Sequence, residues 1–268
     1  MVNKVKNLLA GGTIQRDALQ IYAIQFLSLG LGLVGSIIVA RTLGPANKGI
    51  FDLFNLLSSF IVEFGLLGFG SGLLYYLANK GEPVSKTHGT GLIFVLVMGC
   101  LTAITGWLGL PGWKRIFPGL QDWIILLAFF WAPAAYYRII WSNILTGINR
   151  AVVTYRIGLY ITVVNILAIV TLWASNRLDV ENIIRLTAML GVINGIVAFI
   201  ILCKHERKVK ASLNLARKSL RYGLVIYVGF IANIMHFKID QVMINYWLGT
   251  KAVGIYAVSV RWAEMLFF

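Results

Sequence analysis

Residues 226–256 read IYVGFIANIMHFKIDQVMINYWLGTKAVGIY and repeat, at an offset of 205 residues (226 less 21), the pattern of residues 21–51, IYAIQFLSLGLGLVGSIIVARTLGPANKGIF. The two copies align without a gap: Ile21-Tyr22 match Ile226-Tyr227, Leu43-Gly44 match Leu248-Gly249, and Gly49-Ile50-Phe51 match Gly254-Ile255-Tyr256. Each copy is an apolar stretch, the motif L-G-x4-G-I-aromatic and a second apolar stretch. A unit repeated so far along the chain predicts a duplicated architecture. In membrane proteins such duplication is typical of transporters.

The composition indicates an integral membrane protein. Hydrophobic residues make up 59% of the chain, charged residues 13%, and the mean hydropathy is +0.80, whereas soluble domains are about 45–50% apolar and about 25% charged. The net charge of +14 would suggest nucleic acid in a soluble protein. Here we assign the basic residues to short cytoplasmic loops, and we expect no nucleic-acid partner because no basic module with interleaved aromatic residues is present.

Apolar stretches long enough to cross the hydrocarbon core, about 20 residues each, recur along the chain. They lie near residues 19–40, 50–78, 89–110, 122–148, 157–175, 183–203 and 221–248, with an eighth beginning at 253. The sequence therefore predicts an all-α polytopic membrane protein. Small residues at packing spacing, such as Gly68-x3-Gly72, Gly191-x3-Gly195 and the Gly30/Gly32/Gly35 group, suggest close helix contacts. Pro133 and the glycines from Gly65 to Gly72 predict kinks.

A basic connector divides these spans into two groups. We expect a cytoplasmic segment at 1–18, a first six-helix lobe at 19–203, a basic linker at 204–220 and the beginning of a second lobe at 221–268. The last residue aligns with the interior of a span in the first copy. We therefore expect this chain to be cut short relative to an intact protein of about 410 residues or somewhat more.

Basic residues predict the orientation. With the N-terminus in the cytoplasm, fourteen Lys and Arg residues fall in inside segments and six in outside loops, among them Arg41, Lys48 and Lys251. This asymmetry is the positive-inside signature. Because six spans separate the two copies, the repeat is predicted to be parallel.

Several charged residues lie within the predicted spans: Arg138, Arg185, Lys238, Arg261, Asp52, Glu63, Asp240 and, in the incomplete last span, Glu264. A charge near the bilayer centre costs at least about 2.5–3.5 kcal/mol and normally faces the bundle interior or a wet cavity. Asp52 and Arg185 lie close to span ends, so we expect both to reach the headgroup water.

The span at 221–248 has one polar side. On a helical wheel its polar residues cover an arc of roughly 200°, and these are Asn233, His236, Lys238, Asp240, Gln241 and Asn245. Lys238 and Asp240 point to different faces, so each needs another partner, with Glu63, Arg138 and a substrate as the options. A structural ion pair between helices is the alternative. His236, one turn before Asp240, is a candidate for proton coupling.

Two motifs resemble a known family. Ala40-Arg41-Thr42-Leu43-Gly44-Pro45, followed by Gly49-Ile50-Phe51, is similar to the A-R-x-L-G-P-x3-G-x-[FY] motif of bacterial polysaccharide (O-antigen, Wzx-type) flippases. These belong to the multidrug/oligosaccharidyl-lipid/polysaccharide (MOP) superfamily. Lys238-Ile239-Asp240, followed by Leu248-Gly249 and Gly254-Ile255-Tyr256, resembles the second-lobe motif of the same family.

The resemblance implies a MATE/MOP-like fold of two six-helix lobes around a V-shaped cavity, in the bacterial inner membrane. It implies transport of an undecaprenyl-pyrophosphate-linked oligosaccharide from the inner to the outer leaflet, with membrane lipid and polysaccharide polymerase machinery as partners. A pyrophosphate crossing a medium of low dielectric constant needs cations. The candidates are Lys238, Arg138 and Arg261, with Asp240, Glu63 and His236 as ion-coupling or structural partners.

Two other functions stay open. A drug/cation antiporter of the same superfamily would depend on acidic residues such as Glu63 or Asp240, whereas the span interiors carry more bases than acids. A glycan polymerase or ligase would need essential residues in an outer loop, where Arg177, Asp179 and Glu181 are the candidates. We expect no enzyme activity, no metal and no cofactor. The sequence has no phosphate-binding loop, so an ion gradient or membrane potential would drive any active transport.

Overall fold

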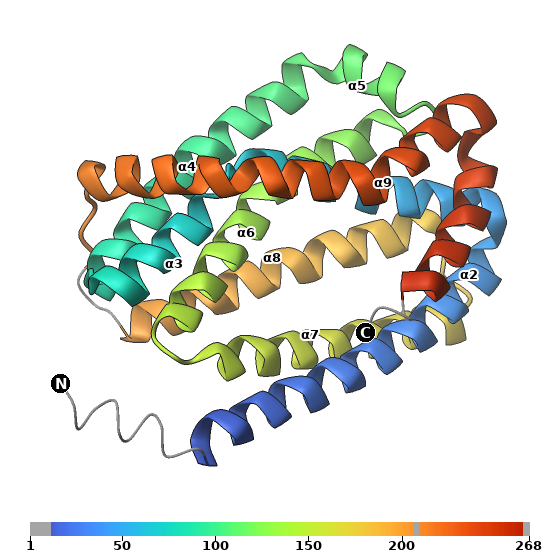
Figure 1. The fold of residues 1–268 in the computed structure, drawn as a ribbon. Helices are drawn as coiled ribbons and strands as arrows, with labels where there is room; N and C mark the ends of the chain where they lie inside the picture. The colour runs from blue at the N-terminus through green and yellow to red at the C-terminus, as the bar shows by residue number, and fades with distance from the viewer. Residues whose placement is uncertain (1–11, 206–208, 265–268) are drawn as a thin grey trace.

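The computed structural model describes residues 12–205 and 209–264, and within these ranges the chain is almost entirely helical and has no strand. In order the helices are α2 (Gly12–Leu66), α3 (Phe69–Lys80), α4 (Val84–Leu108), α5 (Leu110–Ile116), α6 (Asp122–Gly147), α7 (Ala151–Ala174), α8 (Val180–His205) and α9 (Leu213–Glu264). They form one bundle in which α2 and α9, from opposite ends of the chain, pack together (Figure 1). Six of the described helices, α2, α4, α6, α7, α8 and α9, are long and apolar enough to cross a membrane. The predicted all-α polytopic membrane fold is confirmed.

The two longest helices are each bent at a repeated glycine. A straight helix with the 55 residues of α2 would be about 80 Å long, far more than the hydrocarbon core of about 30 Å. The helical geometry is interrupted at Gly44 (φ 71°, ψ 172°) in α2 and at Gly249 (φ 78°, ψ 179°) in α9. This backbone region is essentially restricted to glycine. The motif shared by the two copies therefore encodes a bend between two apolar segments.

A further break separates α2 from α3. Leu67 (φ 50°) and Gly68 (φ 67°) adopt left-handed conformations, so the kink predicted between Gly65 and Gly72 is confirmed. The helix α6, in contrast, runs without interruption from Asp122 to Gly147 through Pro133.

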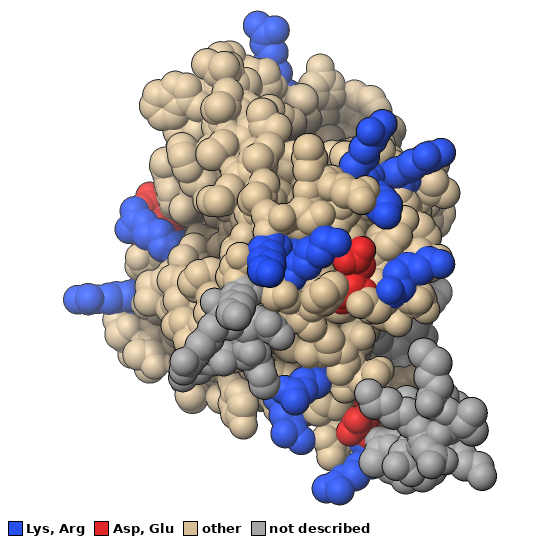
Figure 2. All heavy atoms as spheres, turned by 90° about the vertical axis from the view of Figure 1, so that its left-hand side faces the viewer, with Lys and Arg blue, Asp and Glu red and all other residues tan. Residues whose placement is uncertain are grey.

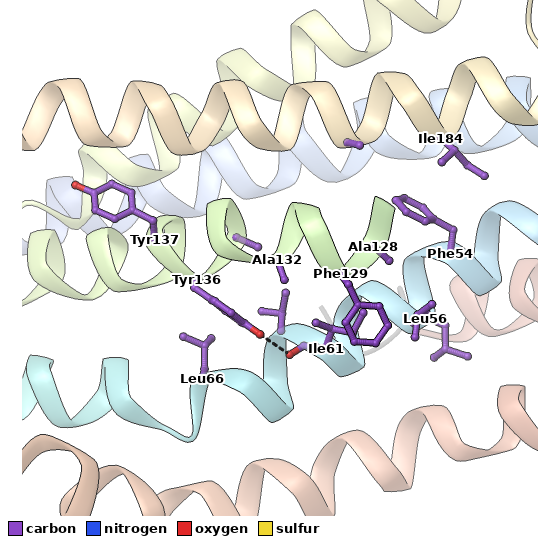
Figure 3. Close-up of a cluster of buried hydrophobic side chains, with 14 of the residues drawn as sticks. Phe54, Leu56, Ile61, Leu66, Ala128, Phe129, Ala132, Tyr136, Tyr137 and Ile184 are labelled. Atoms are coloured by element: carbon purple, nitrogen blue, oxygen red, sulfur yellow. Dashed lines mark hydrogen bonds between the residues drawn. The ribbon is translucent and has the colours of Figure 1, made fainter. Parts of the chain in front are cut away.

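The centre of the bundle is α6. Its interior face is apolar, and small residues at Ala128, Ala132 and Ala135, all buried, let neighbouring helices approach closely. Figure 3 shows Phe129 and Tyr136 of α6 pointing toward the second part of α2, where the Tyr136 hydroxyl donates a 3.1 Å hydrogen bond to the carbonyl oxygen of Ile61. The same hydroxyl lies 2.8 Å from that of Thr102 on α4. A polar clamp therefore joins three helices inside an otherwise apolar core.

Small residues also permit the contact between α3 and the first turns of α9. A Cβ at Gly68 would overlap the carbonyl oxygen of Gly223, and one at Gly72 would overlap that of Ser219. The predicted packing role of this pair is confirmed, and that of Gly191, which contacts the Trp131 indole, is confirmed too. For the group at residues 30–35 the prediction is wrong at two of three positions. Only Gly35 is tightly packed, whereas Gly30 and Gly32 have open space where a Cβ would stand.

The basic connector is partly helical. The helix α8 ends at His205 and α9 begins at Leu213, so α9 includes the second half of the predicted linker 204–220. The extended part docks on α4, because the backbone N–H of Lys210 donates to the Ser85 carbonyl (3.2 Å) and that of Ser212 donates to the Thr90 hydroxyl (3.1 Å). The division of the chain into two lobes at this connector stays a prediction.

Candidate functional site

The two copies of the repeat contact each other through their second glycines. A Cβ at Gly49 would overlap the carbonyl oxygen of Thr250, and a Cβ at Gly254 would overlap that of Pro45. Pro45 and Thr250 occupy equivalent positions in the two copies, as do Gly49 and Gly254. The contact is therefore reciprocal, as it is across a two-fold axis. The L-G-x4-G motif supplies both the bend and the glycine that lets the bent segments meet.

A buried ion pair lies beside this contact. Lys48 and Asp52, one helical turn apart on α2, are only 4% and 8% exposed, and the ammonium group donates a hydrogen bond to the carboxylate. Two predictions made from the sequence are wrong here. Lys48 is not a solvated loop residue, and Asp52 does not extend to the surface. The bend at Gly44 lets α2 restart early enough to bury both side chains against α9.

Next to the ion pair, polar side chains of the two repeats line a common cavity, which we call the seam cavity. It has a volume of about 210 Å³ and is lined by Asp52, Asn55, Leu56 and Ser59 of α2 and by Lys238, Gln241, Ala257 and Val260 of α9. Its walls therefore carry an ammonium group, a carboxylate, two amides and a hydroxyl. Lys238 is the predicted site residue that lies here. A cation among hydrogen-bonding groups in a membrane-spanning bundle suits an anionic or heavily hydroxylated ligand.

The predicted polar arc of α9 divides into two parts. Gln241 and Asn245 are only 6% and 1% exposed: Gln241 lines the seam cavity with residues of α2, and the Asn245 amide donates to the Pro118 carbonyl at 3.2 Å. On the other part, Asn233 and His236 are exposed. Contact with the rest of the described chain therefore covers only part of the arc, and the expectation that the whole arc faces a polar interior stays a prediction.

Asp240 has a partner that the sequence analysis did not consider. Its carboxylate accepts a hydrogen bond from the Tyr256 hydroxyl, which lies beyond the bend at Gly249 on the same helix. Tyr256 is the aromatic residue that closes the repeated motif, equivalent to Phe51 in the first copy. The bond therefore fastens the segment after the bend to the segment before it.

Arg138 lies away from the seam cavity. It lines a second cavity of about 490 Å³ between the first part of α2, α6 and α7, together with Gln25, Ser28, Ser142, Thr154 and Tyr155 among others. Within residues 12–205 and 209–264, no ion pair to its guanidinium is found. The structure therefore separates the two predicted cations, Lys238 and Arg138, into different cavities.

Two of the remaining predicted site residues, Glu63 and His236, do not line either cavity. Glu63 is half-buried on α2, next to Phe64, whose carbonyl accepts a 3.2 Å hydrogen bond from the Tyr227 hydroxyl of α9. His236 is exposed, with its ring edge-on to Phe237 at a centroid distance of 4.9 Å. The side chain of Arg261 lies outside the described part of the chain. Arg185 pairs with Glu181 at 2.9 Å on the exposed surface, as expected for a residue near a span end.

Two residues that the sequence analysis did not select, Asn55 and Ser59, line the seam cavity together with Gln241 of the predicted polar arc. A single amide and a single hydroxyl in an apolar helix are common and gave no separate signal. Lys48 could have been found, because a Lys and an Asp four residues apart behind a helix-restarting Gly-Pro predict a pair on one helix face.

The arrangement of the helices indicates the class of protein, and comparison with known proteins identifies the family. A bundle of membrane-spanning helices in which two copies of one bent unit meet around a polar cavity is the architecture of a transporter with repeated structure. The chain belongs to the polysaccharide biosynthesis protein family, whose model matches residues 14–266. This is the family of MOP-superfamily polysaccharide flippases such as Wzx, as the two motifs predicted. No curated protein and no solved structure matches the chain.

The match covers nearly the whole chain and bears on function at a coarse level. The protein is a multi-pass membrane protein of a polysaccharide-related transporter family. Members of this family are transporters rather than enzymes. This membership suggests interaction with lipid and with lipid-linked sugar.

Proposed function

We propose that this protein is a flippase that moves undecaprenyl-pyrophosphate-linked oligosaccharide units from the inner to the outer leaflet of the bacterial inner membrane. The observation that carries the proposal is the seam cavity, where Lys238 lies between the two repeats among amide, hydroxyl and carboxylate groups. A pyrophosphate needs a cation to cross a medium of low dielectric constant, and sugar hydroxyls need hydrogen-bonding walls. The protein would act as a carrier, without bond-making chemistry on the glycan.

Arg138 extends the proposal to a second position. Its guanidinium lines a separate cavity with hydroxyl and amide groups, and guanidinium groups bind phosphate oxygens through paired hydrogen bonds. We assign Lys238 to the anionic group of the substrate at the seam and Arg138 to an anionic group nearer the first segment of α2. The alternative, a drug/cation antiporter, is less favoured, because two of the acidic residues already have protein partners. Asp52 pairs with Lys48, and Asp240 accepts a hydrogen bond from Tyr256.

The orientation belongs to the same proposal. Figure 2 shows one end of the bundle, where Lys and Arg greatly outnumber Asp and Glu. The loop from α3 to α4, the loop from α6 to α7 and the start of α9 lie at this end (Figure 1). Basic residues in short loops are retained in the cytoplasm. We therefore place this end, and the N-terminus with it, on the cytoplasmic side.

Complementation tests the proposal. A bacterial strain without its own glycan flippase receives the gene that encodes this chain, as wild type or with Lys238→Ala, Lys238→Arg or Lys218→Ala. We expect export of surface polysaccharide from the wild type and the control Lys218→Ala, little from Lys238→Ala, and partial export from Lys238→Arg. Membrane levels are compared on immunoblots. Undiminished export from Lys238→Ala would refute the role of this cation, and Asp240-dependent efflux of a fluorescent cation would favour the antiporter.

A further inference from the structure

A cavity with an almost entirely apolar lining lies between α2, α4, α5, α6 and α9. Its volume is about 420 Å³, which falls in the range of ligand pockets, and we call it the apolar cavity. Aromatic rings form much of its wall, including Phe60, Phe64, Trp113 and Phe129. It reaches the outside of the bundle, because several lining side chains, such as Phe64 and Leu101, are exposed.

The few polar groups of the apolar cavity are already bonded to protein. The Tyr136 hydroxyl binds Thr102 and the Ile61 carbonyl, and the Thr105 hydroxyl donates to the Leu101 carbonyl at 2.7 Å. Water in a cavity needs two to four polar partners, and these groups have little hydrogen-bonding capacity left. The cavity is therefore suited to a hydrocarbon chain, since an empty space of this size would lose packing energy.

The apolar cavity and the seam cavity lie on adjoining faces of the same two helices. On α2, Leu56 lines the seam cavity and Leu57 the apolar cavity. On α9, Lys238 and Gln241 line the seam cavity, whereas the next residues, Ile239 and Val242, line the apolar cavity. The polar and the apolar cavity are thus separated only by the contact between α2 and α9. A ligand that matches both is an amphiphile with an anionic head and a hydrocarbon tail.

We propose that the apolar cavity holds the first isoprene units of the lipid-linked glycan while the pyrophosphate occupies the seam cavity. This inference rests on the proposed function and deepens it. The chain of a lipid whose pyrophosphate lies in the seam cavity begins one helix contact away from the apolar cavity. A carried lipid has its headgroup at that depth and needs an apolar place for its tail at the same level. The two cavities provide such a pair of places.

Photo-crosslinking tests the inference. The full-length gene product is reconstituted in lipid nanodiscs with an isoprenyl pyrophosphate that carries a diazirine on its chain, and labelled peptides are mapped by mass spectrometry. We expect labelling of α9 around Met235 and Ile239 and of α4 around Leu101. Val242→Trp and Leu101→Trp fill the cavity and should each lower this labelling by about tenfold. The matched controls Val228→Trp and Leu96→Trp, at exposed apolar positions of the same helices that do not line the cavity, should leave it unchanged.

The outcomes separate the cavity from the transport function. Labelling that neither filling variant lowers would overturn the assignment of the tail, as would equal labelling by a diazirine phospholipid that excess isoprenyl phosphate does not displace. Two filling variants keep the test valid if one fails to fold, which size-exclusion chromatography would show. Cavity labelling by a protein that does not complement export would count against the proposed transport, whereas normal export without cavity labelling would count only against this inference.

Discussion

Gly44 and Gly249 are required for their backbone conformation rather than for packing. Both have positive φ with ψ near 180°, yet no atom lies within 4 Å of the place where a Cβ would stand. The cost of any other residue there is therefore torsional strain. The repeated Leu-Gly pair therefore places a bend at the same point in both copies of the repeat.

Replacing either bend glycine should destabilise the protein. We expect Gly44→Ala and Gly249→Ala each to lower the free energy of unfolding by about 1–3 kcal/mol, measured by thermal unfolding in detergent micelles. Gly30→Ala is the matched control, because Gly30 lies within a helix with open space around it and alanine there is favourable by about 0.5–1 kcal/mol. Equal melting temperatures for all three variants would contradict the strain argument.

The ion pair of Lys48 and Asp52 should be energetically coupled. A double-mutant cycle with Lys48→Met and Asp52→Asn is expected to give an interaction energy of about 0.5–3 kcal/mol, since both groups are buried. The control cycle uses Glu82 and Lys86, an equally spaced pair at 2.8 Å that is partly exposed, where about 0.2–1 kcal/mol is expected. A coupling no larger than that of the control would show that burial adds nothing to the pair.

At the scale of helices, the decisive contact is the reciprocal approach of Gly49 and Gly254. The contact involves backbone atoms on both sides, so a side chain cannot be accommodated by a rotamer change. It brings the α2 bend against the α9 bend and sets the distance across the seam cavity. The dimensions of the candidate site thus depend on two glycines that do not line it.

Side chains at these two glycines should separate the helices. We expect Gly49→Val and Gly254→Val each to cost about 1–3 kcal/mol in thermal unfolding of the purified protein. Gly229→Val, at an open position on α9, controls for the lower helix propensity of valine. A control that loses as much stability as the two contact variants would contradict the proposed packing.

The positions of the helices were predicted well from the sequence, whereas the contacts between them were predicted less well. Apolar length identified the membrane helices because hydropathy acts locally, whereas the connectors predicted after residues 40 and 248 are bends within continuous helices, at Gly44 and Gly249. The burial of Lys48 and Asp52 depends on α9, which is distant in sequence, and so could not be derived from span ends. The same holds for the polar arc of α9, where only the position of α2 decides that Gln241 is buried and His236 exposed.

At the scale of the whole molecule, charge asymmetry predicts a defined topology. A single cysteine at Lys218, in the basic start of α9, should react with a membrane-impermeant maleimide only after the cells are opened. A cysteine at Lys251, beyond the Gly249 bend, should react in intact spheroplasts. Both side chains are exposed, and Cys100 and Cys203 are first replaced by serine. Reaction of the two sites in the reverse order would invert the proposed orientation.

The whole bundle also bears on the proposed substrate, which has a polar head and an apolar chain. The two repeats meet along α2 and α9, and polar residues line one face of this junction while apolar residues line the next. Neither repeat contains both compartments alone. A lipid-linked glycan is the ligand that such a junction suits best.

The most direct measurement is movement of a lipid-linked glycan across a membrane by the purified gene product. Vesicles containing the protein carry a fluorescent isoprenyl pyrophosphate glycan in both leaflets, and an impermeant reductant quenches the outer one. We predict that wild-type protein makes the inner population accessible as well, and that Lys238→Ala slows this at least about tenfold, whereas Lys218→Ala does not. Quenching that stops at the outer leaflet with wild-type protein, as in protein-free vesicles, would contradict the proposal that this protein is a flippase.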